Sequence, residues 1–160
     1  MRKKPMSLSK LLAEVLGTAM IVASVLGAGF MTYILQAGDP LGLFMIAVTV
    51  GCVLFVAISM LGPISGAHFN PAVSLAFLLR KQMSFAEFWG YVAAQVLGGV
   101  AGAVVANLMF KLDFVSISTV ERFSAETAVG EAVATLGLVL LILLLVVFVP
   151  RFEVSGAGVA

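Results

Sequence analysis

The sequence predicts an all-α membrane protein with four transmembrane helices and one re-entrant half-helix. Of its 160 residues, 62% are hydrophobic and 11% are charged, whereas a soluble domain carries about a quarter charged residues. Four apolar stretches reach about 20 residues, the length that crosses a bilayer as a helix. A further apolar stretch, residues 62–79, is interrupted by Gly-Pro, Ser-Gly and Asn-Pro pairs, which break a continuous helix.

The composition excludes several classes of protein. The chain has one cysteine (Cys52), one histidine (His68) and a net charge of +1. We therefore expect no disulfide scaffold, no nucleic-acid partner, no metal site and no cofactor. Cys52 lies in the middle of an apolar stretch and is expected to be a small packing residue. His68 is interpreted as a structural residue, with a proton relay or metal ligand as the alternatives.

The four predicted spans are residues 11–36, 41–61, 85–110 and 125–149. The first contains one charged residue, Glu14, and the third contains Gln95 in its interior. The fourth carries Glu126 and Glu131 in its first two turns and ends before Pro150, which cannot donate the next helical hydrogen bond. In the third span, small residues recur at four-residue spacing, which predicts close packing within the protomer; they are Ala94, Gly98, Gly102 and Ala106.

The distribution of positive charge predicts a cytoplasmic N-terminus. Seven Lys and Arg residues then lie on the inner side and two on the outer side, provided that residues 62–79 enter and leave from the cytoplasm. We therefore expect a cytoplasmic tail over residues 1–10, followed by a repeat of three spans and the half-helix over residues 11–110. An outer loop over residues 111–124, a fourth span over residues 125–149 and a second tail over residues 150–160 complete the chain.

A cleaved signal peptide is the alternative interpretation of the first span. However, the apolar run of that span is long for a signal peptide and contains Glu14.

The broken stretch predicts non-helical backbone over residues 62–69, at membrane depth. Such backbone is tolerated where it is buried in protein or lines a wet cavity. Asn70 and Pro71 then favour a helix start, because asparagine caps first-turn amides and proline suits the first helical position. The alternative is a loop followed by an ordinary interfacial helix, since Asn-Pro pairs are common in turns.

A helix from Pro71 to Arg80 is about 15 Å long, half the thickness of the hydrocarbon core. With Arg80 and Lys81 at the cytoplasmic surface, its amino end lies near the bilayer midplane. Unpaired amides at that end carry positive partial charge. A path past them would offer hydrogen bonds to neutral solutes and repel cations.

Residues 65–74, with the sequence SGAHFNPAVS, resemble the first signature of the major intrinsic proteins, the family of aquaporins and aquaglyceroporins. The sequences AEVLGT at residues 13–18 and YVAAQVLGG at residues 91–99 support the resemblance, which covers roughly residues 11–149. It implies an aquaporin-like fold of two inverted repeats, each with three spans and a half-helix. It also implies a passive channel for water or small uncharged solutes, assembled as a homo-tetramer in a plasma or inner membrane.

The resemblance also implies roles for individual residues. Asn70, with Pro71 and Ala72, corresponds to the first pore asparagine and its motif, and a loop with carbonyls along the pore wall is formed by Gly66, Ala67, His68 and Phe69. Glu14, Glu131 and Gln95 correspond to polar side chains that brace the pore loops. For Glu131, the alternative is a solvated first-turn residue.

Val50 corresponds to one position of the family's narrow filter, where strict water channels usually place phenylalanine. The smaller valine implies a wider filter, suited to glycerol-like solutes or metalloid hydroxides.

An internal repeat is visible, because residues 13–18 align with residues 130–135 at an offset of 117. The same offset from Asn70 gives position 187, whereas the sequence has 160 residues. We therefore expect a truncated chain or fragment with an incomplete inverted repeat, which conducts poorly or not at all.

Three other functions are alternatives to a channel. An intramembrane hydrolase would use Ser65 and His68, but no Gly-x-Ser-x-Gly elbow accompanies them. A broken-helix secondary transporter would need ionisable groups on its path, and residues 41–79 contain only His68. A non-conducting four-helix membrane protein is the third alternative.

Overall fold

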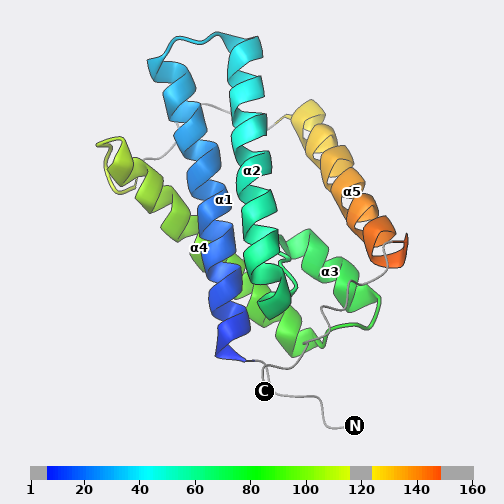
Figure 1. Cartoon of the computed structure of the whole chain (residues 1–160). Helices are drawn as coiled ribbons and strands as arrows, with labels where there is room; N and C mark the ends of the chain where they lie inside the picture. Colours follow the sequence, from blue (N-terminus) through cyan, green and yellow to red (C-terminus); the bar gives the residue numbers. More distant parts are fainter. Residues whose placement is uncertain (1–6, 116–123, 149–160) are drawn as a thin grey trace, which may run out of the picture. The chain divides into compact units, whose positions relative to one another are not determined.

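The computed structural model describes residues 7–115 and 124–148, and over those residues the chain is entirely helical or irregular (Figure 1). The helices are α1 (Leu8–Ile34), α2 (Asp39–Ser65), α3 (Pro71–Leu79), α4 (Phe85–Met109) and α5 (Ala125–Phe148). Three of them, α1, α2 and α4, are long and apolar enough to cross a membrane, and so is the Ala125–Leu144 part of α5. The predicted fold class is confirmed.

The described residues belong to two compact units, the first containing α1 to α4 and the second containing α5. Within the first unit, α1 packs against α2 and against α4, and α3 packs against α4. The predicted tails, apart from residues 7–10, and most of the predicted outer loop lie outside the described residues.

Side-chain caps fix the start of two spans. Ser7 precedes α1 and accepts a hydrogen bond from the Lys10 amide. Ser84 and Glu87 form a capping box at the start of α4, in which each side chain accepts from the other residue's amide. The same S-x-x-E spacing is visible in the sequence and indicates why α4 begins at Phe85.

The second span is longer than predicted, because α2 continues through Pro63 to Ser65. Pro63 lies in the last turn of α2, where its missing amide removes only one hydrogen bond near the helix end. The helix ends instead at Gly66, which adopts a left-handed φ of 90° and donates its amide to the Gly62 carbonyl at 2.9 Å. The non-helical backbone is therefore residues 66–70, not 62–69.

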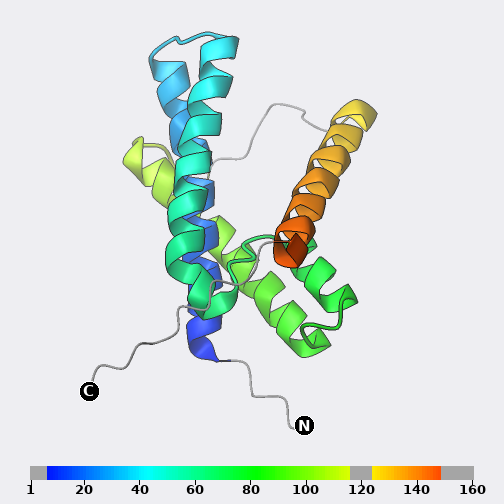
Figure 2. The same cartoon turned by 45° about the vertical axis from the view of Figure 1, so that its right-hand side comes forward.

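The helix directions show that α3 does not complete a crossing. Gly98 and Gly102 of α4 contact Val15 and Ala19 of α1 in the same order, so α1 and α4 run parallel. In contrast, α1 and α2 are joined by a short link and run antiparallel (Figures 1 and 2). Because α2 runs back from the end of α1 to the side where α4 begins, α2 is the only membrane crossing between α1 and α4. The segment containing α3 must therefore enter and leave on the same side of the membrane.

The small-residue face of α4 lies against α1, as predicted. Ala94, Gly98, Gly102 and Ala106 are all buried. A Cβ atom added at Gly98 would collide with the Val15 backbone, and one added at Gly102 would collide with the Ala19 backbone. The two helices therefore approach through their backbones, which requires glycine at both positions.

We predict that Gly98→Ala destabilises the protein by about 1–3 kcal/mol, because the added methyl group overpacks a backbone contact. Gly99→Ala is the matched control, since its Cβ would meet only Val22 at an ordinary 3.9 Å. The measurement is the unfolding free energy in detergent. Equal stabilities for the two variants would contradict the close approach of α1 and α4.

Candidate functional site: a loop anchored by a buried carboxylate

The loop between α2 and α3 is anchored by Glu14 of α1, whose side chain is fully buried. Its Oε1 accepts hydrogen bonds from the Ser65 hydroxyl at 2.7 Å and the His68 amide at 3.0 Å. Its Oε2 accepts from the Phe69 amide at 2.7 Å and from Gln95 Nε2 at 2.8 Å. An ionised carboxylate offers about four lone-pair positions and no donor. These four donors therefore satisfy it completely.

The loop backbone is shaped to bind this carboxylate. Ala67 and Phe69 have left-handed φ values of 53° and 50°, a conformation that costs roughly 1–2 kcal/mol for a residue with a Cβ. With the chain turned in this way, the amides of His68 and Phe69 both reach Glu14, and the Ala67 amide reaches Ser65 Oγ at 3.0 Å. Consecutive amides converging on one anion form a nest. The hydrogen bonds to Glu14 offset the strain of the loop.

A second layer of polar side chains surrounds the anchor. Gln95 Nε2 also donates to Ser74 Oγ at 3.1 Å, and Ser74 Oγ lies 3.1 Å from His68 Nδ1. Tyr91 donates its hydroxyl hydrogen to the Ser65 carbonyl at 2.6 Å. These contacts tie the loop to α3 and α4 as well as to α1.

The amides and the carbonyls of the loop backbone differ in their hydrogen bonding. The amides of Ala67, His68 and Phe69 are all bonded to side chains behind the loop. Within the described residues, no donor reaches the carbonyls from Gly66 to Phe69. The loop therefore binds its donors on the anchored side, while its carbonyls have no partner in the described part of the chain.

Asn70 stands at the start of α3, next to these carbonyls. Its Oδ1 accepts a hydrogen bond from the Ala72 amide at 2.8 Å, which makes it the N-cap of α3. Pro71 occupies the first helical position. Because Oδ1 faces the helix, the Nδ2 amide points away from it, and it has no partner among the described residues. Asn70 therefore presents a donor beside a row of acceptors.

The structure brings most of the predicted site residues together. Glu14 contacts the loop directly, and Gln95 is linked to the loop through Glu14. Asn70, Pro71 and Ala72 continue the loop into α3. Val50 is half-buried in α2 and lies about 22 Å along the helix from Ser65, so it stands well apart from the loop. Glu131 is exposed within the unit that contains α5.

Three residues of the network were not assigned a role from the sequence: Ser65 as a carboxylate ligand, Ser74 and Tyr91. One signal for Tyr91 is present, because it lies one helical turn before Gln95, on the face that also carries Ala94 and Gly98. The same network includes Ser65 and His68, the pair that an intramembrane hydrolase would use. Ser65 Oγ donates to Glu14, and His68 Nδ1 pairs with Ser74.

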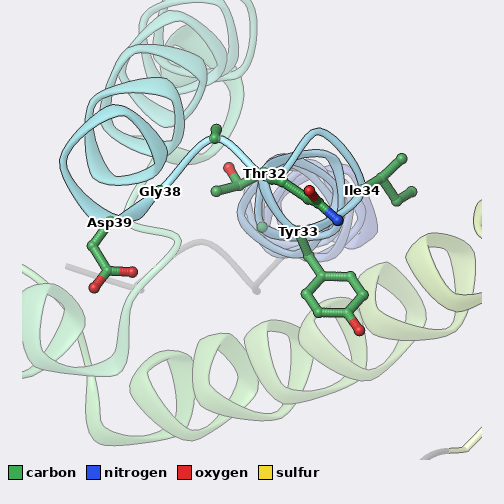
Figure 3. Close-up of a pocket in the computed structure, with 8 residues that line it drawn as sticks. Thr32, Tyr33, Ile34, Gly38 and Asp39 are labelled. Atoms are coloured by element: carbon green, nitrogen blue, oxygen red, sulfur yellow. The ribbon is translucent and has the colours of Figure 1, made fainter.

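A separate hollow lies at the link between α1 and α2 (Figure 3). It has a volume of about 520 Å³, and Thr32, Tyr33 and Asp39 are among the residues that line it. None of the predicted site residues takes part in its lining. The hollow is therefore distinct from the anchored loop.

We predict that Glu14→Gln destabilises the protein by about 3 kcal/mol or more. Whichever way the glutamine amide is turned, its NH2 group faces two of the four donors, and each unmatched buried donor costs about 1–3 kcal/mol. The measurement is the unfolding free energy in detergent.

The same exchange at an exposed position, Glu126→Gln, is the control, and removing its first-turn charge should cost at most about 1 kcal/mol. If Glu14→Gln were no more disruptive than this control, the loop would not depend on the carboxylate.

Comparison with known proteins assigns the chain to a family. The profile described as "Major intrinsic protein" matches residues 1–156. The aquaglyceroporin AqpS of Rhizobium meliloti is 44% identical over 131 residues, which are 82% of this chain and 56% of that protein. Aquaporin-2 of Rattus norvegicus is 33% identical over 145 residues, 91% of this chain and 52% of that protein.

Aquaporin NIP3-1 of Arabidopsis thaliana is 41% identical over 104 residues, covering 65% of this chain and 32% of that protein. The chain therefore spans about half the length of the relatives that it matches, or less. The resemblance stated from the signature at residues 65–74 is confirmed, together with the four apolar helices of an integral membrane protein. The chain belongs to the major intrinsic protein family.

Proposed function

We propose that the protein is a passive channel for water and small uncharged solutes, and that the anchored loop forms part of its wall. The observation that carries the proposal is the one-sided hydrogen bonding of residues 66–69. The amides of Ala67, His68 and Phe69 are bound to Glu14 and Ser65, and no donor among the described residues reaches the carbonyls of residues 66–69. A row of free carbonyls replaces part of a solute's hydration shell.

Asn70 adds the complementary group. Its Nδ2 donates into the same space, and the amino end of α3 adds positive partial charge. A solute that both donates and accepts hydrogen bonds, such as water or a polyol, matches this pairing. A cation would meet the carbonyls but would be repelled by the helix end.

The distance of the loop from Lys10 along α1 supports a position inside the bilayer. Phe69 packs against Gly17, which lies about 10 Å along α1 from Lys10. If Lys10 is at the cytoplasmic surface, the loop comes within about 5 Å of the midplane of a 30 Å hydrocarbon core. The basic residues near the N-terminus favour this orientation. By family resemblance, we place the protein in a plasma or inner membrane.

We further propose a homo-tetramer with one pathway in each protomer, and a role for Glu131 as the brace of an inverted second loop. Both proposals rest on the family resemblance. Because the described residues supply one wall of the pathway, we infer that these 160 residues alone conduct more slowly than a longer relative.

Vesicles containing the chain test this function. We expect osmotic swelling in water and glycerol gradients that is slower than with a longer relative but faster than in protein-free vesicles, with no cation leak. Swelling at the protein-free rate would support the non-conducting four-helix alternative. Solute uptake that requires an ion gradient would support the broken-helix transporter instead.

We predict that Asn70→Asp lowers the protein-dependent swelling rate roughly fivefold, the equivalent of one hydrogen bond of about 1 kcal/mol. Aspartate retains the acceptor that caps α3 but replaces the Nδ2 donor with negative charge. The variant should also leak cations, which a potential-sensitive dye detects.

Asn70→Ser is the matched control, because serine caps the helix without adding charge. It should not leak cations. Unchanged swelling and no leak in Asn70→Asp would remove Asn70 from the pathway.

We predict that Val50→Phe lowers the ratio of glycerol to water permeability, because a larger ring narrows the pathway for the wider solute first. The same substitution at Val48, which is exposed on a different face of α2, is the control. Stopped-flow swelling in the two gradients gives the ratio. An equal ratio in both variants would show that Val50 does not select the solute.

A further inference from the structure

We propose that the turn between α3 and α4 binds the headgroup of an anionic phospholipid. The surface consists of Arg80 and Lys81 in the turn and the aromatic residues Phe85 and Trp89 in the first turns of α4, and we name it the basic-aromatic surface. It lies away from Asn70, at the opposite end of α3. The proposal is independent of whether the protein conducts.

The two cations are held on an ordered backbone. The Arg80 amide donates to the Ala76 carbonyl at 3.1 Å, and the Lys81 amide donates to the Leu78 carbonyl at 2.9 Å. Lys81 adopts a left-handed φ of 58°, and the next amide, of Gln82, returns to the Phe77 carbonyl at 3.0 Å. This double return closes the end of α3. Adjacent positive charges are therefore presented without a mobile loop between them.

Both cationic side chains are exposed. Within the described part of the chain, neither of them forms an ion pair or a side-chain hydrogen bond. The nearest acidic residue along the chain, Glu87, accepts hydrogen bonds from the Ser84 amide and hydroxyl, both at 2.8 Å. Its carboxylate is thus engaged by the cap of α4. The pair Arg80 and Lys81 therefore retains a positive field that attracts a phosphate.

Aromatic residues follow the two cations along the chain, in the first turns of α4. The Phe85 and Trp89 rings contact each other edge to face, with centroids 6.1 Å apart, and the Phe88 ring lies 5.2 Å from Trp89. Trp89 is 55% exposed and lies one helical turn into α4. Tryptophan prefers the boundary between headgroups and acyl chains. The two cations match the headgroup of a lipid, and the aromatic rings in the first turns of α4 match the upper part of its acyl chains.

This order of groups favours a lipid over a soluble acidic partner. A soluble peptide would engage the two cations from water but would leave Phe85 and Trp89 exposed to the acyl layer. An anionic phospholipid contacts both, because its phosphate and its chains are covalently joined. Cations near an anionic surface each contribute about 1 kcal/mol, roughly fivefold in affinity.

The chain carries its own reporter of this contact, because Trp89 is its only tryptophan. The full chain is reconstituted into phosphatidylcholine vesicles that contain equal, low fractions of either brominated phosphatidylglycerol or brominated phosphatidylcholine. Bromine quenches tryptophan fluorescence on contact, so quenching of Trp89 measures which lipid occupies its boundary. We expect at least about twofold stronger quenching by the anionic lipid, and a smaller difference at about 1 M salt, where the Debye length is about 3 Å.

In the double variant Arg80→Gln/Lys81→Gln, the two brominated lipids should quench Trp89 equally. Lys111→Gln is the matched control, because Lys111 lies just beyond the opposite end of α4 and has the same left-handed backbone as Lys81. It should retain the preference for the anionic lipid.

Three results would overturn the proposal. One is equal quenching of the unmodified chain by the two brominated lipids. Another is a preference that survives in the double variant, which would place the anionic lipid on other cations. The third is no quenching by either lipid, which would show that the basic-aromatic surface does not face the bilayer.

Discussion

Four hydrogen bonds to the buried carboxylate of Glu14 hold the non-helical segment between α2 and α3 in place. Unpaired backbone amides cost several kcal/mol each in a lipid environment, and an isolated carboxylate there is costly as well. The loop and Glu14 solve both problems together, because the amides of His68 and Phe69 and the side chains of Ser65 and Gln95 satisfy the carboxylate. Removing either partner leaves the other buried and unmatched.

The same interaction determines what the loop presents on its other side. Each peptide unit has its amide and carbonyl on opposite edges, so amides turned toward α1 leave carbonyls turned away from it. Asn70 repeats this division within one side chain, with Oδ1 used to cap α3 and Nδ2 left to donate. The close backbone contact between α1 and α4 at Gly98 and Gly102 keeps Glu14 and Gln95 at a fixed separation. Packing, anchoring and the proposed chemistry therefore depend on one another.

Much of this arrangement was predictable from the sequence, because it follows from local rules. The apolar lengths predict the spans, Asn70-Pro71 predicts the start of α3, and the small-residue spacing in α4 predicts its buried face. The Gly-Pro pair predicts too early an end for α2, because a proline in the last turn of a helix costs less than a proline in mid-helix. The full ligand set of Glu14 could not be derived in this way. It joins residues separated by 51 to 81 positions, and such contacts depend on how helices pack.

Amide hydrogen exchange of His68 and Phe69 in reconstituted protein tests the central claim most directly. Both amides lie outside any helix, so an unanchored loop would exchange them as fast as other irregular backbone. Bound to Glu14 at 3.0 and 2.7 Å, they should instead exchange as slowly as amides inside α3. Fast exchange of these two amides, with α3 itself protected, would contradict the anchored loop and the pathway wall built on it.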